Sequence, residues 1–183
     1  MGRDAVEVLS DEHDSLRDLF TRVSGVDEDR PAVLQELLKT LSMHVAVEKK
    51  MVVPVVKERV GDGDAQAGRL TDYHDQVERI HVLLDRRKVN SPDVPDLVTQ
   101  LLDLTDAHID EADATLLPAL REALSAEELS ELGTAMSSDD RDLLTHPHPL
   151  LPDTGPLAKV GRWAASVVDR GRDRSTDIGR SSS

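Results

Sequence analysis

Four histidines carry the strongest chemical signal in this chain of 183 residues, because each falls on the apolar stripe of a different helix-like segment. They are His13, His44, His74 and His108. Burying an imidazole without a hydrogen-bond partner costs on the order of 1–3 kcal/mol. A single buried histidine is ordinarily hydrogen-bonded to a neighbouring side chain. Four histidines, one on the apolar stripe of each helix, indicate that all four bind something in common. Neutral imidazole is a common metal ligand, so the pattern predicts a metal site.

Glu48 adds an oxygen ligand to this set. It follows His44 by four residues, which places both side chains on one helix face, about 5–6 Å apart. A carboxylate can bridge two metal ions, which an imidazole cannot easily do, so the pair favours a two-metal centre. The alternative is a solvated glutamate that pairs with Lys49 or Lys50. Its place on the same stripe as His44 and Met51 favours the ligand.

The segments that must position these residues predict an all-α fold. Apolar residues recur at alternating intervals of three and four in four segments, which is typical of amphipathic helices. We expect the first helix to have Ser10 as its N-cap and the second to begin near Pro31. The third and fourth cover about 70–84 and 97–124. Short turns between long helices favour an up-down-up-down four-helix bundle.

Residues 1–135 are expected to form this bundle together with a short fifth helix. The Ser-Ala-Glu-Glu sequence that begins at Ser125 has the form of a capping box, and Gly133 is expected to end the helix. Residues 136–183 are expected to form a proline-containing linker and a mildly basic, partly disordered tail, with a short amphipathic helix around Trp163.

An internal repeat relates the two halves of the bundle. Residues 44–60 align with 108–124, so that histidine matches histidine and Pro54 matches Pro118. Both prolines fall inside apparently helical runs. There each one removes a backbone hydrogen bond and clashes with the carbonyl group four residues earlier, which costs about 3 kcal/mol in a regular helix. We therefore expect a kink or a wide turn close to the metal site in each half.

The composition excludes several classes of function. The formal net charge of -14 repels phosphate backbones, so a nucleic-acid partner is not expected. The absence of cysteine excludes disulfides, thiolate zinc sites and cysteine nucleophiles. Only three aromatic residues are present, which predicts an aliphatic core. No stretch approaches the roughly 20 apolar residues that span a bilayer, and the N-terminus lacks a signal-peptide pattern, so we expect a cytoplasmic protein without a membrane partner.

The order histidine, His-x3-Glu, histidine, and then a further histidine followed by carboxylates resembles the hemerythrin family, in its bacterial HHE cation-binding branch, over residues 10–124. The proline-containing tail resembles extensions of actinobacterial members. The resemblance implies a non-heme site of two iron ions, bridged by carboxylate or oxide, that binds dioxygen, peroxide or nitric oxide. The ligand types alone do not distinguish iron from manganese, and the resemblance favours iron.

The ligands that the resemblance carries over are His13, His44, Glu48, His74 and His108. The second half departs from the family pattern, because Ala112 occupies the position equivalent to Glu48. Asp113, five residues after His108, matches the aspartate of the oxygen-carrying hemerythrins. In a regular helix it would point about 140° away from His108, so it requires a π-type bulge. Glu111 needs no bulge and is the alternative, but Asp113 is preferred.

The third helix also departs from the family pattern. Oxygen-carrying hemerythrins have a second histidine four residues after the first, and Glu78 occupies that position here. His81, seven residues after His74, shares the same face. Either side chain could complete the coordination, and a third carboxylate would favour oxidised iron over reversible dioxygen carriage.

Three functions fit these expectations. The first is a protein that carries, stores or senses dioxygen or nitric oxide. The second is an enzyme that disproportionates or reduces peroxide at the di-iron centre, which an excess of carboxylate ligands favours. The third is an iron-storage or interaction protein that docks through its tail. The sequence leaves the choice among them and the oligomeric state open.

Overall fold

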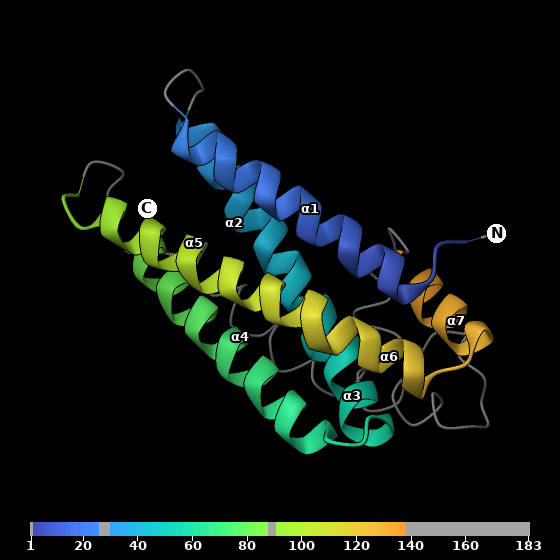
Figure 1. The fold of residues 1–183 in the computed structure, drawn as a ribbon. Helices are drawn as coiled ribbons and strands as arrows, with labels where there is room; N and C mark the ends of the chain where they lie inside the picture. The colour runs from blue at the N-terminus through green and yellow to red at the C-terminus, as the bar shows by residue number, and fades with distance from the viewer. Residues whose placement is uncertain (1, 26–29, 88–90, 138–183) are drawn as a thin grey trace, which may run out of the picture.

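The computed structural model describes residues 2–25, 30–87 and 91–137, and every regular element within these ranges is a helix (Figure 1). This confirms the all-α bundle. Four long rods pack side by side, and successive rods run in opposite directions (Figure 1). They are formed by α1 (Ala5–Ser24), by α2 (Arg30–Val47) continued through η1 (Glu48–Val52) and α3 (Val53–Arg59), by α4 (Gly63–Asp85), and by α5 (Val94–Glu111) continued through η2 (Ala112–Leu116) and α6 (Leu117–Ala123).

The first helix begins at Ala5, six residues before the expected start after Ser10, and Ser10 lies inside α1. Asp4 is the N-cap, and its carboxylate accepts a hydrogen bond from the backbone N–H of Glu7 at 2.9 Å. The Glu7 carboxylate in turn accepts one from the backbone N–H of Asp4 at 3.0 Å. This capping box satisfies two backbone donors, and burial of Val6 and Leu9 extends the apolar stripe toward the N-terminus.

The two wide turns expected from the prolines are π-helical segments. In η1 the backbone N–H of Val53 donates to the carbonyl of Glu48, five residues earlier, and in η2 that of Leu117 donates to the carbonyl of Ala112. A proline follows each of these donors. The wider turn moves the carbonyl group four residues before the proline away from its ring, so each helix continues beyond Pro54 and Pro118.

The core is divided into two aliphatic clusters with the histidines between them. One cluster includes Leu9, Val55 and Leu120, and the other includes Leu16 and Leu101. Because His13 lies between Leu9 and Leu16 on the same stripe, and the other three histidines lie at the same level of the bundle, a polar layer separates the two clusters. The apolar layers on either side keep water away from this polar layer.

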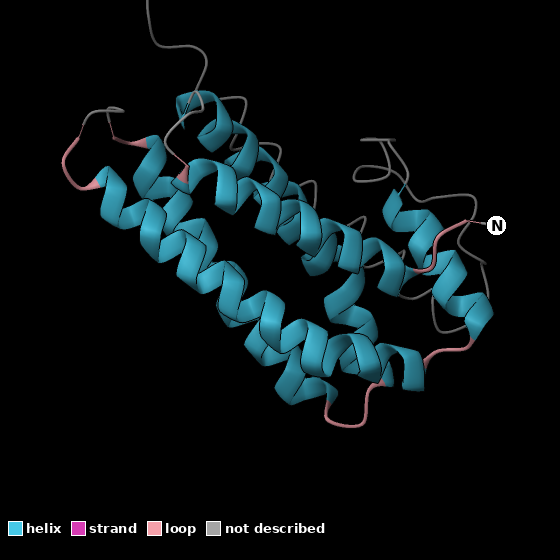
Figure 2. Ribbon diagram, turned by 45° about the horizontal axis from the view of Figure 1, so that its top comes forward, coloured by secondary structure: helices cyan, strands magenta, loops and turns pink. Residues whose placement is uncertain are grey.

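A fifth helix, α7 (Ala126–Ser137), packs against the start of α1 at one end of the bundle (Figure 2). Ser125 and Glu128 form the expected capping box, with hydrogen bonds of 3.3 and 2.8 Å. The expectation that Gly133 ends this helix is wrong. Gly133 is buried in its middle, where a Cβ atom would lie only 2.4 Å from the carbonyl oxygen of Arg3. Glycine is therefore required there for close packing.

The predictions for the tail, including the helix around Trp163, lie outside the described residues. Within the ranges that are described, no helix combines the length and the apolarity that crossing a membrane requires.

Candidate metal centre

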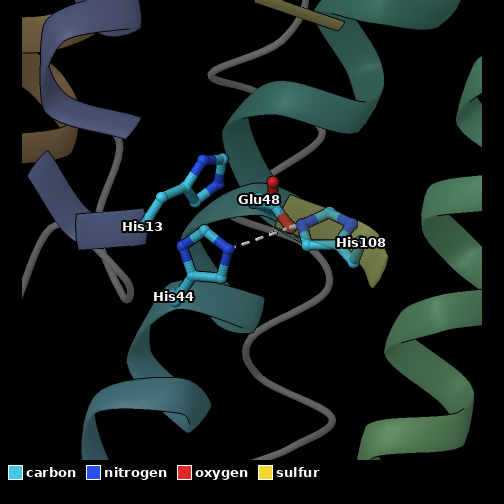
Figure 3. Close-up of side chains that lie close together, drawn as sticks. All are labelled: His13, His44, Glu48 and His108. Carbon is cyan, nitrogen blue, oxygen red and sulfur yellow. Dashed lines mark ion pairs between the residues drawn. The ribbon is translucent and has the colours of Figure 1, made fainter. Parts of the chain in front are cut away.

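Four buried side chains converge in the polar layer (Figure 3). They are His13 from α1, His44 from α2, Glu48 from η1 and His108 from α5. Each can offer one ligand atom, and these four atoms all lie within 4.8 Å of one another. His13 and His108, which are 95 positions apart in the chain (108 − 13), thus lie close together. The packing of the helices brings them to the same height along the bundle axis.

Glu48 lies at the centre of this arrangement and is completely buried. One carboxylate oxygen, Oε2, lies 2.9 Å from Nε2 of His74, 3.4 Å from Nε2 of His108 and 3.5 Å from Nε2 of His44. Burial alone would raise the pKa of this carboxyl group. The charge of His44, the proximity of His108 and the hydrogen bond from His74 outweigh burial, and the pKa of Glu48 lies well below its ordinary value. The side chain is therefore a buried carboxylate anion.

Several donor atoms in this cluster have no hydrogen-bond partner among the described residues. They are Nε2 of His13, Nε2 of His44, Nε2 of His108 and the second oxygen of Glu48, Oε1. Each such buried atom costs about 1–3 kcal/mol if nothing binds it. A cation would accept these lone pairs and balance the glutamate charge at the same time, so the residues fit a metal ion.

Two further carboxylates hold the outer sides of the imidazole rings. Glu12 lies 2.8 Å from Nδ1 of His44, and Asp113 lies 2.9 Å from Nδ1 of His13. A carboxylate only accepts, so Nδ1 of each ring must carry the proton and donate it, which leaves the Nε2 lone pair directed inward. Carboxylates that orient metal-binding histidines in this way are common in metal sites.

The pKa values of these two histidines move in opposite directions. Burial, followed by the charge of His44, lowers the pKa of His13 despite its bond to Asp113. Burial also acts to lower the pKa of His44, but the charges of Glu48 and Glu12 and the hydrogen bond to Glu12 outweigh it and raise the pKa. The lowered pKa of His13 favours the neutral form that binds a metal, whereas the raised pKa of His44 means that a metal ion competes there more strongly with a proton.

Sequence reasoning missed Glu12. It directly precedes His13, and neighbouring residues on a helix point about 100° apart, so its position next to His13 gave no reason to connect it with the site. Its role depends on α2 packing beside α1, which brings His44 to its carboxylate. The available signal was the pairing of the first two rods, which would have placed Glu12 opposite His44.

Asp113 lies at the edge of the cluster. It belongs to the π-helical segment η2, as its expected role required, and its side chain is 39% exposed. Besides His13, it accepts a hydrogen bond from Arg17 at 3.1 Å. Burial would raise the pKa of Asp113, but the bonds from His13 and Arg17 outweigh it and lower the pKa.

Three other candidates lie away from the cluster. Glu78, with a side chain that is 56% exposed, forms an ion pair with Lys49 at 2.6 Å. Glu111 likewise pairs with Arg69 at 2.5 Å on the surface. Nδ1 of His81 lies 3.0 Å from the hydroxyl group of Ser42, which is two residues before His44 on α2. Each of these three side chains therefore contacts a residue of a neighbouring helix and not the buried cluster.

Comparison with known proteins gives the same assignment for most of the chain. Residues 4–120 match the hemerythrin HHE cation-binding domain. A DNA nickase of Nostoc sp. is 29% identical over 135 residues, which is 70% of this chain and 36% of that protein. An uncharacterized hemerythrin-like protein of Schizosaccharomyces pombe is 25% identical over 134 residues, 73% of this chain and 66% of that protein. The chain thus spans less than two thirds of either relative.

A solved structure shares the fold. It is a hemerythrin HHE cation-binding domain-containing protein from Mycobacterium kansasii, which superposes with a TM-score of 0.60 and covers 93% of both chains. The two sequences are 22% identical, so this likeness supports the arrangement of the helices alone.

Proposed function

The chain belongs to the hemerythrin HHE cation-binding domain family, and we propose that it is a non-heme di-iron protein that binds dioxygen, peroxide or nitric oxide. The observation that carries this proposal is the convergence of unpartnered, buried donor atoms on one point. Nitrogen and carboxylate ligands in a set of five or more suit iron or manganese better than tetrahedral zinc. Membership of the family favours iron.

We propose that Glu48 would hold the metal ions together with His13, His44, His74 and His108. The surroundings of Glu48 support this set. Its Oε2 lies within 3.5 Å of Nε2 of His44, His74 and His108, and its Oε1 has no partner among the described residues. We assign Asp113 to the site as the carboxylate that accepts the Nδ1 proton of His13 and so orients that ring.

When bound, iron would supply the affinity for a small oxidant or diatomic molecule and the accompanying exchange of electrons. The chain supplies the rest. Glu12 holds the proton of His44 at Nδ1, and Asp113 holds that of His13. The aliphatic clusters on both sides of the polar layer exclude water, which protects a reactive ligand from side reactions.

The surface positions of two glutamates favour ligand binding over peroxide chemistry. Extra carboxylates at the metal would favour peroxide chemistry, but Glu78 pairs with Lys49 and Glu111 pairs with Arg69. A site with four histidines and Glu48, in which Asp113 only orients His13, has fewer carboxylate ligands and suits reversible binding better.

A nucleic acid is not the partner that we propose. The relative from Nostoc is a DNA nickase, but the matched region covers 36% of that protein. The formal net charge of -14 of this chain opposes binding to phosphate backbones.

Metal content and spectroscopy of two matched variants test the proposal. Protein purified in air, or reconstituted with ferrous iron, is expected to contain two irons per chain and to show near-ultraviolet charge-transfer absorption. His74→Ala should lose iron while it stays helical. His81→Ala removes a histidine from the same face of α4, and it should retain both irons because His81 contacts Ser42 instead.

Several outcomes would count against this function. One iron or none in the wild-type protein would contradict the di-iron centre, and tightly bound zinc or manganese would contradict the choice of metal. Equal iron loss in His74→Ala and His81→Ala would contradict the ligand assignment. Evolution of gas on addition of hydrogen peroxide would identify a peroxide-disproportionating enzyme instead of a binding protein.

A further inference from the structure

A groove of about 270 Å³ runs between α4 and the rod formed by α5 and η2. Its deep part is mostly apolar, and its mouth is polar. The deep part is lined by Leu70, Tyr73, Leu104, His108, Ala112 and Leu116. The groove therefore connects the surface with one of the four residues of the cluster, His108.

His108 is the most exposed of the clustered histidines. It is 7% exposed, compared with 1% for His13 and 2% for His44. The ring of Tyr73 stacks on that of His108 with their centroids 3.9 Å apart and their planes 2° from parallel. Since Nε2 of His108 is 3.4 Å from Glu48, the floor of the groove lies one ring away from the centre of the site.

Ala112 keeps this passage open. It is the residue that the internal repeat aligns with Glu48, so a carboxylate could have stood at this position. Its methyl group is nearly buried and forms part of the groove wall beside His108. Ala112, which departs from the family pattern, thus leaves space between the groove and the site. A longer side chain at this position would fill that space.

The mouth of the groove carries little net charge. Arg69 on α4 pairs with Glu111 on α5 across the opening, and Asp72 lies beside them. One arginine against two carboxylates leaves a single negative charge, on a chain that is itself acidic. Such an opening disfavours small anions and admits uncharged molecules.

We propose that this groove is the access route by which a small uncharged molecule, such as nitric oxide, dioxygen or hydrogen peroxide, reaches the metal centre from the His108 side. The proposal rests on the proposed function. In this proposal the groove is the route, its mouth is the opening, and Ala112 controls the width of the passage. The ligand atoms of the site are otherwise enclosed between the two apolar clusters.

A second groove approaches from the opposite side, between α1 and the rod formed by η2 and α6, with a volume of about 350 Å³. None of the four clustered residues lines it. Asp113 does, and its carboxylate is held by both His13 and Arg17, which closes the way inward. Ser10 also lines this groove, so a bulky residue at Ser10 provides a matched control.

The first test uses metal-free protein and is independent of iron. Diethyl pyrocarbonate, a small uncharged reagent that acylates imidazole, is added, and mass spectrometry follows each histidine. We expect His108 to react before His13, His44 and His74. Ala112→Leu should slow acylation of His108 but not that of the reference residue His81. Earlier reaction of His13, or an unchanged rate at His108 in the variant, would overturn the proposed route.

The second test measures nitric oxide binding to iron-loaded protein by stopped-flow spectroscopy. Ala112→Leu is expected to slow association about tenfold with unchanged iron content, whereas Ser10→Leu should leave the rate within about twofold of the wild type. Gln76→Trp, which fills the same groove from an exposed position, covers the case in which Ala112→Leu does not fold. Slowing by Ser10→Leu alone would place the route on the other side.

These two tests separate the failure of the route from the failure of the function. If wild-type protein binds no iron or no nitric oxide, the proposed function is wrong, while acylation of His108 still decides whether the groove leads to the site. If iron and nitric oxide bind but neither groove variant slows association, the route is wrong and the function stands.

Discussion

His44 on α2 donates a hydrogen bond from Nδ1 to the carboxylate of Glu12 on α1, over 2.8 Å. This contact joins two helical segments of the bundle and holds a proton at Nδ1, so that Nε2 is the ring nitrogen that faces Glu48 and is available to a metal. A residue that touches no metal thereby determines whether His44 can bind one.

Replacement of Glu12 should therefore weaken metal binding without unfolding the bundle. We expect Glu12→Ala to lower iron affinity by about 10–100-fold, because His44 loses the acceptor that orients it. Glu12→Gln keeps an oxygen acceptor for Nδ1 and should recover most of the affinity. Competition with a chelator measures the affinity, and circular dichroism checks the helices. Equal affinities for the two variants would show that Glu12 does not position the ring.

Gly133 and Gly68 form a matched pair of sites for testing how alanine substitutions change the free energy of unfolding. Gly133→Ala places a Cβ atom 2.4 Å from the carbonyl oxygen of Arg3, so α7 must shift away from α1, at a cost of about 1–3 kcal/mol. Gly68→Ala is in α4, where nothing lies within 4 Å of the new atom, and should stabilise the protein by roughly 0.5–1 kcal/mol. Urea unfolding of metal-free protein measures both. Similar effects of the two substitutions would contradict the packing of α7 on α1.

The ion pair between Glu128 and Arg59 should make α7 sensitive to acid. The hydrogen bonds from Arg59 and from Ser125 lower the pKa of Glu128 from 4.5 to about 2. A carboxyl group whose pKa is lower in the folded state stabilises that state above the unfolded value. Its contribution is lost as the pH falls from about 4.5 to about 2.

The measurement is the free energy of unfolding from pH 6 to pH 2. Glu128→Gln should be less stable than the wild type at pH 6, and the difference should shrink toward pH 2. Glu127→Gln, at an exposed neighbouring position of α7, controls for the change in net charge. A difference between Glu128→Gln and the wild type that does not vary with pH would rule out this linkage.

Periodicity was sufficient to predict the bundle and the residues that come together in its buried cluster, His13, His44, Glu48 and His108. The stripes that carry His13 and His108 require no tertiary information, because a spacing of three and four residues already defines a helix face. The sequence also predicted a kink or a wide turn before Pro54 and Pro118, because neither proline fits a regular helix that continues beyond it, and the structure has π-helical segments there.

The features that were missed depend on which rods are neighbours. Glu12 and Glu78 are both glutamates on helices, yet one faces His44 and the other faces Lys49, and only the packing of the rods distinguishes them. Gly133 was expected to end a helix because glycine commonly does so, but a close approach of α1 explains it. The start of α1 is a different error, because the Asp4–Glu7 capping box is visible in the sequence and Ser10 was chosen instead.

The polar layer that divides the core has a consequence for cooperativity. Two aliphatic clusters joined across a layer with unpaired donors are expected to open separately when no metal is present, as local unfolding units. A bound metal would contact side chains from α1, α2, η1 and α5, so the two units would then be expected to unfold together. The supply of metal would then influence how long the chain survives proteolysis.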